Sequence, residues 1–80
     1  MTGYGPDLER EPFKVYPNPT NNTIHFSLEK ASIVHIYDSS GRLILSQKYE
    51  TGNVVIDLSQ QTAGVYFLKI DDRTVRIVRE

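Results

Sequence analysis

The sequence predicts an all-β fold, and three observations support this prediction. Apolar side chains recur at every second position in several short runs of the chain. Turn-forming Gly, Pro, Asn, Asp and Ser residues separate these runs at near-regular spacing. No stretch shows the three-to-four-residue apolar spacing of an amphipathic helix. We count seven such runs, a pattern typical of an antiparallel β-sandwich with an immunoglobulin-like arrangement.

The composition limits how this fold can be stabilised and what it can bind. Eighty residues make one small domain, which buries only about three fifths of its unfolded surface. The chain has no cysteine, so neither a disulfide nor a thiolate-bound metal can add stability. Its formal net charge of -1 gives no reason to expect nucleic acid as a partner. No apolar run approaches the length of a membrane span.

The first part of the chain, residues 1–12, is polar and without periodicity, and we interpret it as linker or cloning residues. The predicted domain comprises residues 13–80. The opening Met1–Pro6 has neither the basic region nor the apolar stretch of a signal peptide. We therefore expect the chain to be a fragment of a longer protein that carries any export signal upstream.

The first predicted strand is Phe13–Tyr16, and it should lie at the edge of a sheet. Pro17 and Pro19 follow it, and because neither has an N–H, this segment cannot join the middle of a ladder. The run Tyr16–Pro19 has two interpretations. It is either a rigid turn at the edge or an exposed recognition feature that loses little entropy on binding. Both stay open.

The middle of the chain contains four predicted strands, at residues 23–28, 32–38, 42–49 and 53–58. Period-two alternation assigns one face of each strand to the core. The side chains predicted to point inward are Ile24, Phe26 and Leu28; Val34 and Ile36; Leu43 and Leu45; and Val54, Ile56 and Leu58. The third strand is ambiguous, because Ile44 then points the opposite way.

The last two predicted strands form a hairpin. Gly64–Ile70 has apolar bulk on both faces, which is typical of an interior strand, and Arg73–Arg79 returns along it after the turn Asp71-Asp72. A two-residue turn places apolar residues in two cross-strand pairs, Leu68 with Val75 and Tyr66 with Ile77. The spacing of Gly64 and Tyr66 is also typical of a tyrosine corner, in which the hydroxyl of Tyr66 binds the loop before it.

We predict no catalytic, metal-binding or cofactor site. The chain offers no cysteine nucleophile, and no serine stands in a nucleophile-elbow pattern. His25 and His35 would be neighbours only in a direct hairpin, and two ligands on an exposed face make a weak metal site. Asp71 and Asp72 are best interpreted as turn formers. A small enzyme or metalloprotein therefore ranks last among the functions considered.

Three arginines in the last strand, Arg73, Arg76 and Arg79, have two interpretations. They protect an edge strand against adding to another sheet, or they present a basic edge to a partner. The sequence leaves both open, and it also leaves open self-association of the domain through its first or last edge strand.

An ordered set of short motifs resembles a known family over residues 13–80. The motifs are Val15-Tyr16-Pro17-Asn18-Pro19, Ile36-Tyr37-Asp38 with Gly41-Arg42, Ile56-Asp57-Leu58-Ser59, Ala63-Gly64-Val65-Tyr66, and a basic, apolar tail. Each motif alone is short, but the set in this order and at this spacing resembles the type IX secretion C-terminal sorting domain, also called the type A secretion tail.

The resemblance implies a targeting function without enzymatic activity or cofactor. In this family the C-terminal domain directs a cargo protein, once in the periplasm, through the outer-membrane type IX translocon to the cell surface or medium. A sortase-like surface protease then usually removes the domain from the upstream cargo domains.

The resemblance also assigns roles to residues. The signature residues carried over are Tyr16, Pro17, Asn18, Pro19, Gly41, Arg42, Gly64 and Tyr66. The tail that the translocon is expected to recognise is Val75, Arg76, Ile77, Val78 and Arg79. This tail is rich in arginine where lysine is common in the family, and it ends in Glu80.

An alternative function is that of an accessory β-sandwich of a secreted enzyme, which binds carbohydrate or spaces domains. A carbohydrate-binding module presents several exposed aromatic side chains in a platform or groove. The outward aromatic candidates are Tyr37, Tyr49 and Phe67, and they lie on different predicted strands.

Overall fold

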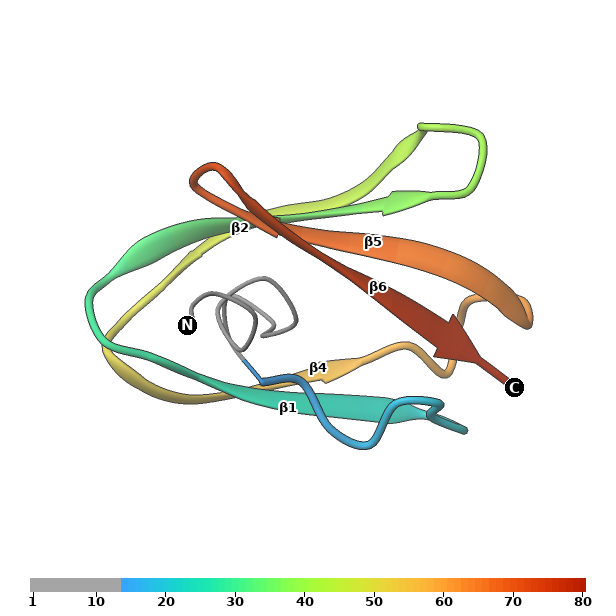
Figure 1. Cartoon of the computed structure of the whole chain (residues 1–80), viewed down its shortest axis with the longest axis horizontal. Coiled ribbons are helices and arrows are strands. Elements are labelled where there is room, and N and C mark those ends of the chain that lie inside the picture. The colour runs from blue at the N-terminus through green and yellow to red at the C-terminus, as the bar shows by residue number, and fades with distance from the viewer. Residues whose placement is uncertain (1–13) are drawn as a thin grey trace, which may run out of the picture.

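The computed structural model describes residues 14–80, which form two antiparallel β-sheets that face each other across one core (Figure 1). These residues contain no helix, so none that could span a membrane. The strands are β1 (Thr23–Leu28), β2 (Ser32–Asp38), β3 (Leu43–Tyr49), β4 (Gly52–Asp57), β5 (Gly64–Ile70) and β6 (Arg73–Arg79). One sheet has the order β1-β4 and the other β3-β2-β5-β6. The predicted all-β class is confirmed.

The described residues hold six strands, where we predicted seven. The segment predicted as the first strand, residues 13–16, contributes one isolated bridge between Tyr16 and His25, and Phe13 lies outside the described residues. Pro17 and Pro19 explain the short pairing, because neither can donate to a ladder. The immunoglobulin-like arrangement stays a prediction, and the predicted domain boundary after residue 12 also lies outside the described residues.

The C-terminal hairpin has the predicted register. Leu68 pairs with Val75 and Tyr66 pairs with Ile77. The interior position of β5 is confirmed, since it lies between β2 and β6. Asp71 in the turn has a positive φ of 56°, a conformation that Asp tolerates better than most residues.

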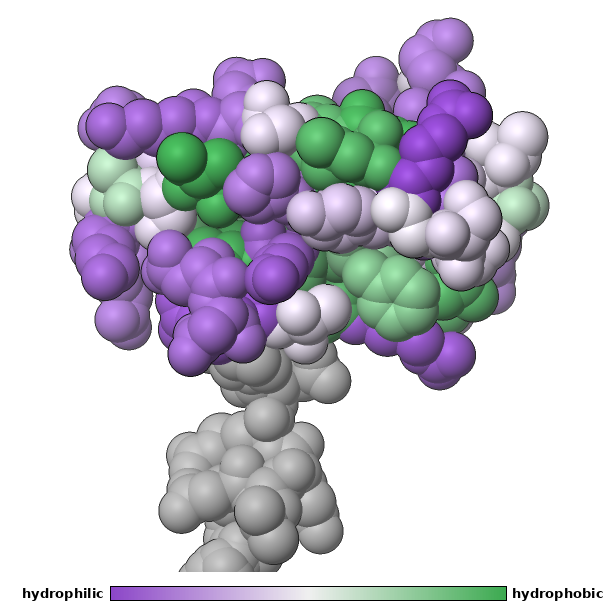
Figure 2. Space-filling model, turned by 90° about the horizontal axis from the view of Figure 1, so that it is seen from above, coloured by the Kyte–Doolittle hydropathy of each residue, from purple (hydrophilic) through white to green (hydrophobic). Residues whose placement is uncertain are grey.

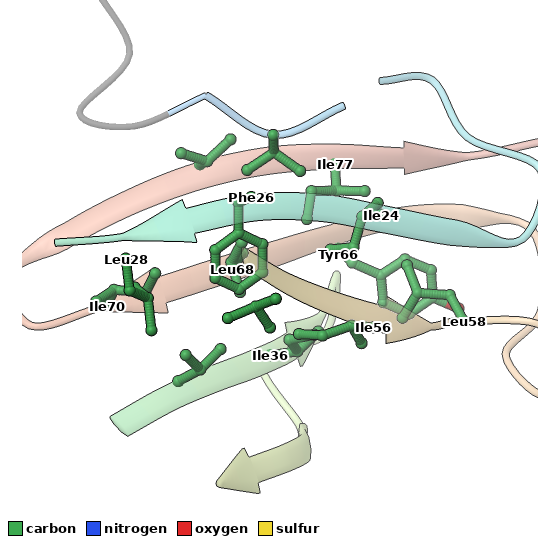
Figure 3. Packing of buried hydrophobic residues seen from close by; sticks show 14 residues of the cluster. Ile24, Phe26, Leu28, Ile36, Ile56, Leu58, Tyr66, Leu68, Ile70 and Ile77 are labelled. Atoms are coloured by element: carbon green, nitrogen blue, oxygen red, sulfur yellow. The ribbon is translucent and has the colours of Figure 1, made fainter. Parts of the chain in front are cut away.

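The core lies between the two sheets and is built from side chains at alternating positions (Figure 3). Its buried members are Val15, Ile24, Phe26, Leu28, Val34, Ile36, Val54, Ile56, Leu58, Tyr66, Leu68, Ile70, Val75 and Ile77. Every inward residue predicted for β1, β2 and β4 is among them, as is Leu58, which follows β4. Period-two alternation therefore located this core correctly outside β3.

Strand β3 departs from the prediction. Leu43, predicted to point inward, is 46% exposed, whereas Ile44 packs against the core together with Leu45. The cause is a β-bulge. Ile36 of β2 pairs with Leu45 while the next residue pairs with Leu43, so Ile44 is an extra residue in the ladder.

The two histidines are not neighbours. His25 lies on β1 and His35 on β2, and these strands belong to different sheets. The ring of His25 stacks on Tyr16 with centroids 5.5 Å apart, and that of His35 stacks on Tyr37 at 6.2 Å. Within residues 14–80 no three His, Asp or Glu side chains gather in a way that could hold a metal ion.

Candidate functional site

One side of the sandwich is crossed by residues 14–20, which we call the edge segment (Figure 1, blue). Tyr16 exchanges two backbone hydrogen bonds with His25 of β1, at 3.0 and 2.7 Å. Thr20 makes a parallel bridge to Arg79 of β6. Because β1 and β6 are edge strands of different sheets, the edge segment joins the two sheets. Val15, buried in the core, anchors it.

The side chain of Asn18 pairs with β6 as a neighbouring strand would. Its Nδ2 donates to the carbonyl oxygen of Arg76 at 2.8 Å. Its Oδ1 accepts from the backbone N–H of Val78 at 3.0 Å. One side-chain amide thus supplies both the donor and the acceptor that a peptide group offers.

Thr20 continues this pairing with its backbone. Its N–H donates to the carbonyl oxygen of Val78, and its carbonyl oxygen accepts from the N–H of Glu80, both at 2.8 Å. Only 2% of Thr20 is exposed, and its hydroxyl donates to the carbonyl oxygen of Thr23 at 2.5 Å. Asn18 and Thr20 together cover the edge of β6 from residue 76 to residue 80.

The first signature motif therefore lies against the C-terminal strand in space. Its residues Tyr16, Pro17, Asn18 and Pro19 are all exposed, and the ring of Tyr16 is stacked on His25. The segment thus has features of both interpretations of the sequence. It covers a sheet edge, and it also presents its side chains to solvent.

The side chains of the tail divide into two sets. Val75 and Ile77 are buried in the core, and Arg79 is half-buried. The Nε of Arg79 donates to the carbonyl oxygen of Leu58 at 2.8 Å, which ties β6 to the end of β4. In the folded domain this leaves Arg76 and Val78 as the tail side chains that point to the outer face of the sheet.

The second signature pair, Gly41 and Arg42, belongs to the turn between β2 and β3. Oδ1 of Asp38 accepts hydrogen bonds from the hydroxyl of Ser40 at 2.6 Å and from the N–H of Arg42 at 2.9 Å. Gly41 has a φ of 91°, which a residue with a Cβ rarely adopts. The motif therefore specifies a turn held by one carboxylate.

The third signature pair, Gly64 and Tyr66, forms the predicted tyrosine corner. Tyr66 is 4% exposed, and its hydroxyl donates to the carbonyl oxygen of Thr62 at 2.5 Å. The prediction from the sequence is thus confirmed. Between this corner and the Asp38 turn lies an open hollow of about 330 Å³, so the second and third motifs meet at one end of the sandwich.

Two turn aspartates are stabilised in their ionised form. The hydroxyl of Ser40 and then the N–H of Arg42 lower the pKa of Asp38 below its ordinary value. The side chain and then the backbone N–H of Ser59 lower the pKa of Asp57 in the same way. A lowered pKa in the folded state contributes stability above the unfolded-state pKa of about 3.9, and this contribution is lost as the pH falls through the folded-state value.

Acidification below about pH 4 should therefore destabilise the domain through these two turns. The double variant Asp38→Asn with Asp57→Asn should lose stability at pH 6, because two charge-assisted acceptors are gone, and should depend less on pH than the wild type. Urea unfolding of the wild type and the double variant between pH 6 and pH 3 measures the loss of stability and its pH dependence. Parallel pH curves for the wild type and the double variant would contradict the role of these carboxylates.

The sequence alone assigned no site role to two residues of these sites, Thr20 and Asp38, although Asp38 stands in one of the family motifs. Asp38 has a recognisable signal, because an Asp followed by Ser-Ser-Gly is typical of a turn in which the side chain accepts backbone N–H groups. Thr20 has no such signal. Its burial depends on β6, which lies nearly sixty residues further along the chain.

Comparison with known proteins identifies the family. The model of a family described as "Secretion system C-terminal sorting domain" matches residues 14–80. No curated protein and no solved structure matched the chain. The family match spans the edge segment, all six strands and the tail. The chain therefore belongs to the family of secretion system C-terminal sorting domains.

Proposed function

We propose that this domain directs a cargo protein from the periplasm across the outer membrane by type IX secretion, and that it acts as a folded module. Family membership makes it a targeting module and not a catalyst, with export to the cell surface or medium as the outcome. The observation that carries the proposal is the edge segment bound to β6. Asn18 and Thr20 unite the first signature motif with the tail in one folded surface.

The proposal includes three partners that follow from the family. The outer-membrane translocon recognises the domain, and upstream cargo domains are carried with it. A sortase-like surface protease then separates the domain from the cargo by cleavage within residues 1–12.

The β6 edge that Asn18 and Thr20 cover is not free for pairing with a second copy between residues 76 and 80.

One observation favours the alternative function in carbohydrate binding. Tyr37 of β2 and Phe67 of β5 are direct cross-strand partners, so two partly exposed aromatic rings lie next to each other despite their distance in sequence. Tyr49, the third aromatic candidate, instead packs against the core. Two adjacent rings could form part of an aromatic platform for a sugar. The family match, however, favours the sorting function over carbohydrate binding.

An export assay tests the proposed function. The 80-residue chain is fused to the C-terminus of a reporter that carries a periplasmic signal peptide, in a host with the type IX system. We expect the reporter at the cell surface or in the medium. Deletion of Val75–Glu80 should leave it in the periplasm, because the deletion removes both the tail and two core side chains, Val75 and Ile77.

A second variant separates a folded signal from a linear one. Tyr66→Ala keeps the complete tail sequence but removes a buried ring of the core. A folded signal predicts that Tyr66→Ala stays in the periplasm once the substitution has unfolded the domain. Full export of a Tyr66→Ala chain that thermal unfolding shows to be unfolded would show that an unfolded tail is sufficient. Surface export of the fusion without Val75–Glu80 would rule out the tail as part of the signal.

A further inference from the structure

The outer face of the four-stranded sheet has a charge distribution unlike that of the whole domain. Its outward side chains are Ile33, His35 and Tyr37 of β2; Leu43, Ser46 and Lys48 of β3; Val65, Phe67 and Lys69 of β5; and Thr74, Arg76 and Val78 of β6. None of these is acidic, although the chain has a formal net charge of -1. Lys48, Lys69 and Arg76 make the face basic.

An apolar band crosses the same face. The pairing register places Leu43, Tyr37, Phe67 and Arg76 in one row across all four strands. Val65 and Val78 form a second pair beside this row. Leu43 is 46% exposed, and both aromatic rings are partly exposed. Seen from above, several green hydrophobic areas reach the surface on this side of the molecule, with purple hydrophilic residues around and between them (Figure 2).

This face also contains the accessible part of the tail. Of the five tail residues, Val75 and Ile77 are in the core and Arg79 donates a hydrogen bond to the carbonyl oxygen of Leu58, so Arg76 and Val78 are the two tail side chains that lie on this face. Arg76 lies opposite Phe67. The tail is therefore continuous with the apolar band, and a protein that binds one also covers the other.

We propose that the export machinery recognises the folded tail through this face, which we call the basic-apolar face. This inference rests on the proposed sorting function and specifies its docking surface. Aromatic residues and arginine are enriched in the buried centres of protein interfaces. The partner's surface is apolar at its centre and carries carboxylates that meet Lys69 and Arg76, because complementary potentials steer association and suppress wrong partners.

Charge reversal on the face tests the inference in the reporter fusion. Lys69→Glu with Arg76→Glu changes two exposed side chains of the face. Lys30→Glu with Thr51→Glu and Val55→Glu changes three exposed side chains outside the face and outside the edge segment by the same formal charge. We expect surface reporter to fall on the order of tenfold or more for the first variant, because like charges then meet across the interface. The matched variant should export like the wild type, and thermal unfolding should show both folded.

The possible outcomes separate the inference from the proposed function. Absence of surface reporter with the wild-type fusion would overturn both. Normal export of the wild type and equal export of the folded Lys69→Glu, Arg76→Glu variant would overturn the docking face alone. Two further results, each with unchanged export, would reassign the face. These are dimerisation of the wild-type chain that the variant abolishes, and retention of the wild type but not the variant on a polygalacturonate column.

Discussion

Replacing Tyr66 with alanine should lower the free energy of unfolding by roughly 3–5 kcal/mol, as for other truncations of large buried aromatic residues. Tyr66 is 4% exposed and lies in the core opposite Ile77. A domain of this size holds only roughly 4–12 kcal/mol at 0.05–0.15 kcal/mol per residue. The substitution should therefore remove a large share of the total stability. Urea unfolding of the purified chain measures this loss.

The variant Tyr66→Phe is the matched control, because it keeps the ring and removes only the hydroxyl. The lost hydrogen bond to the carbonyl oxygen of Thr62 should cost about 1 kcal/mol, which corresponds to roughly 4–8 °C in Tm for a domain of this length. Equal stabilities of Tyr66→Phe and the wild type would show that the corner bond contributes nothing net. A wild-type Tm for Tyr66→Ala would contradict its place in the core.

The sequence was sufficient to predict the elements whose burial alternates with period two. Along β1, β4 and β6, one face is mainly apolar and a slip of one residue would expose that apolar set, so a single register satisfies the pattern. Tyr66 is a further example, since the Gly-x-Tyr spacing carries its own local signal. These predictions succeed because each depends only on residues that are close together in the sequence.

Strand β3 shows where this reasoning fails. Leu43, Ile44 and Leu45 are all apolar, so the sequence does not mark which of them point inward. The bulge opposite Ile36 inserts one residue and turns Ile44 toward the core. A bulge is a property of two paired strands, and the sequence of β3 alone does not specify it.

The contact between Asn18 and β6 could not be predicted for a related reason. Its two hydrogen bonds join residues 58 and 60 positions apart. The prolines on either side of Asn18 indicated an edge, but they did not indicate which strand the edge belonged to. The side chain of Asn18 takes the place of a neighbouring strand, and a single polar side chain leaves no periodic pattern in the sequence. The contact can therefore be recognised only in the structure, where β6 lies at the end of its sheet.

The contacts of Asn18 and Thr20 protect the exposed edge of β6, which every open β-sheet has to manage. An edge strand presents unpaired N–H and C=O groups that can pair with another chain. At β6, Asn18 and Thr20 satisfy four of these groups, on Arg76, Val78 and Glu80. Because β6 is also the proposed recognition strand, the same contacts that protect it also fix its orientation.

Replacing Asn18 with alanine should remove both side-chain hydrogen bonds to β6, at about 0.5–1.5 kcal/mol each, for a total of roughly 1–3 kcal/mol. The loss should be local. The N–H of Val78 loses its acceptor and should exchange with solvent faster, whereas the N–H of Glu80 keeps its bond to Thr20 and should stay protected. Amide hydrogen exchange measured by NMR resolves the two groups.

Two controls make this prediction specific. Asn18→Asp keeps an acceptor for Val78 but replaces the donor to the carbonyl oxygen of Arg76 with a repelling carboxylate, so it should destabilise the domain while Val78 retains more protection than in Asn18→Ala. Asn21→Ala alters an exposed asparagine of the same turn and should change neither measurement. Unchanged exchange at Val78 in Asn18→Ala would show that solvent replaces the side chain without loss, and that the edge segment does not hold β6 through Asn18.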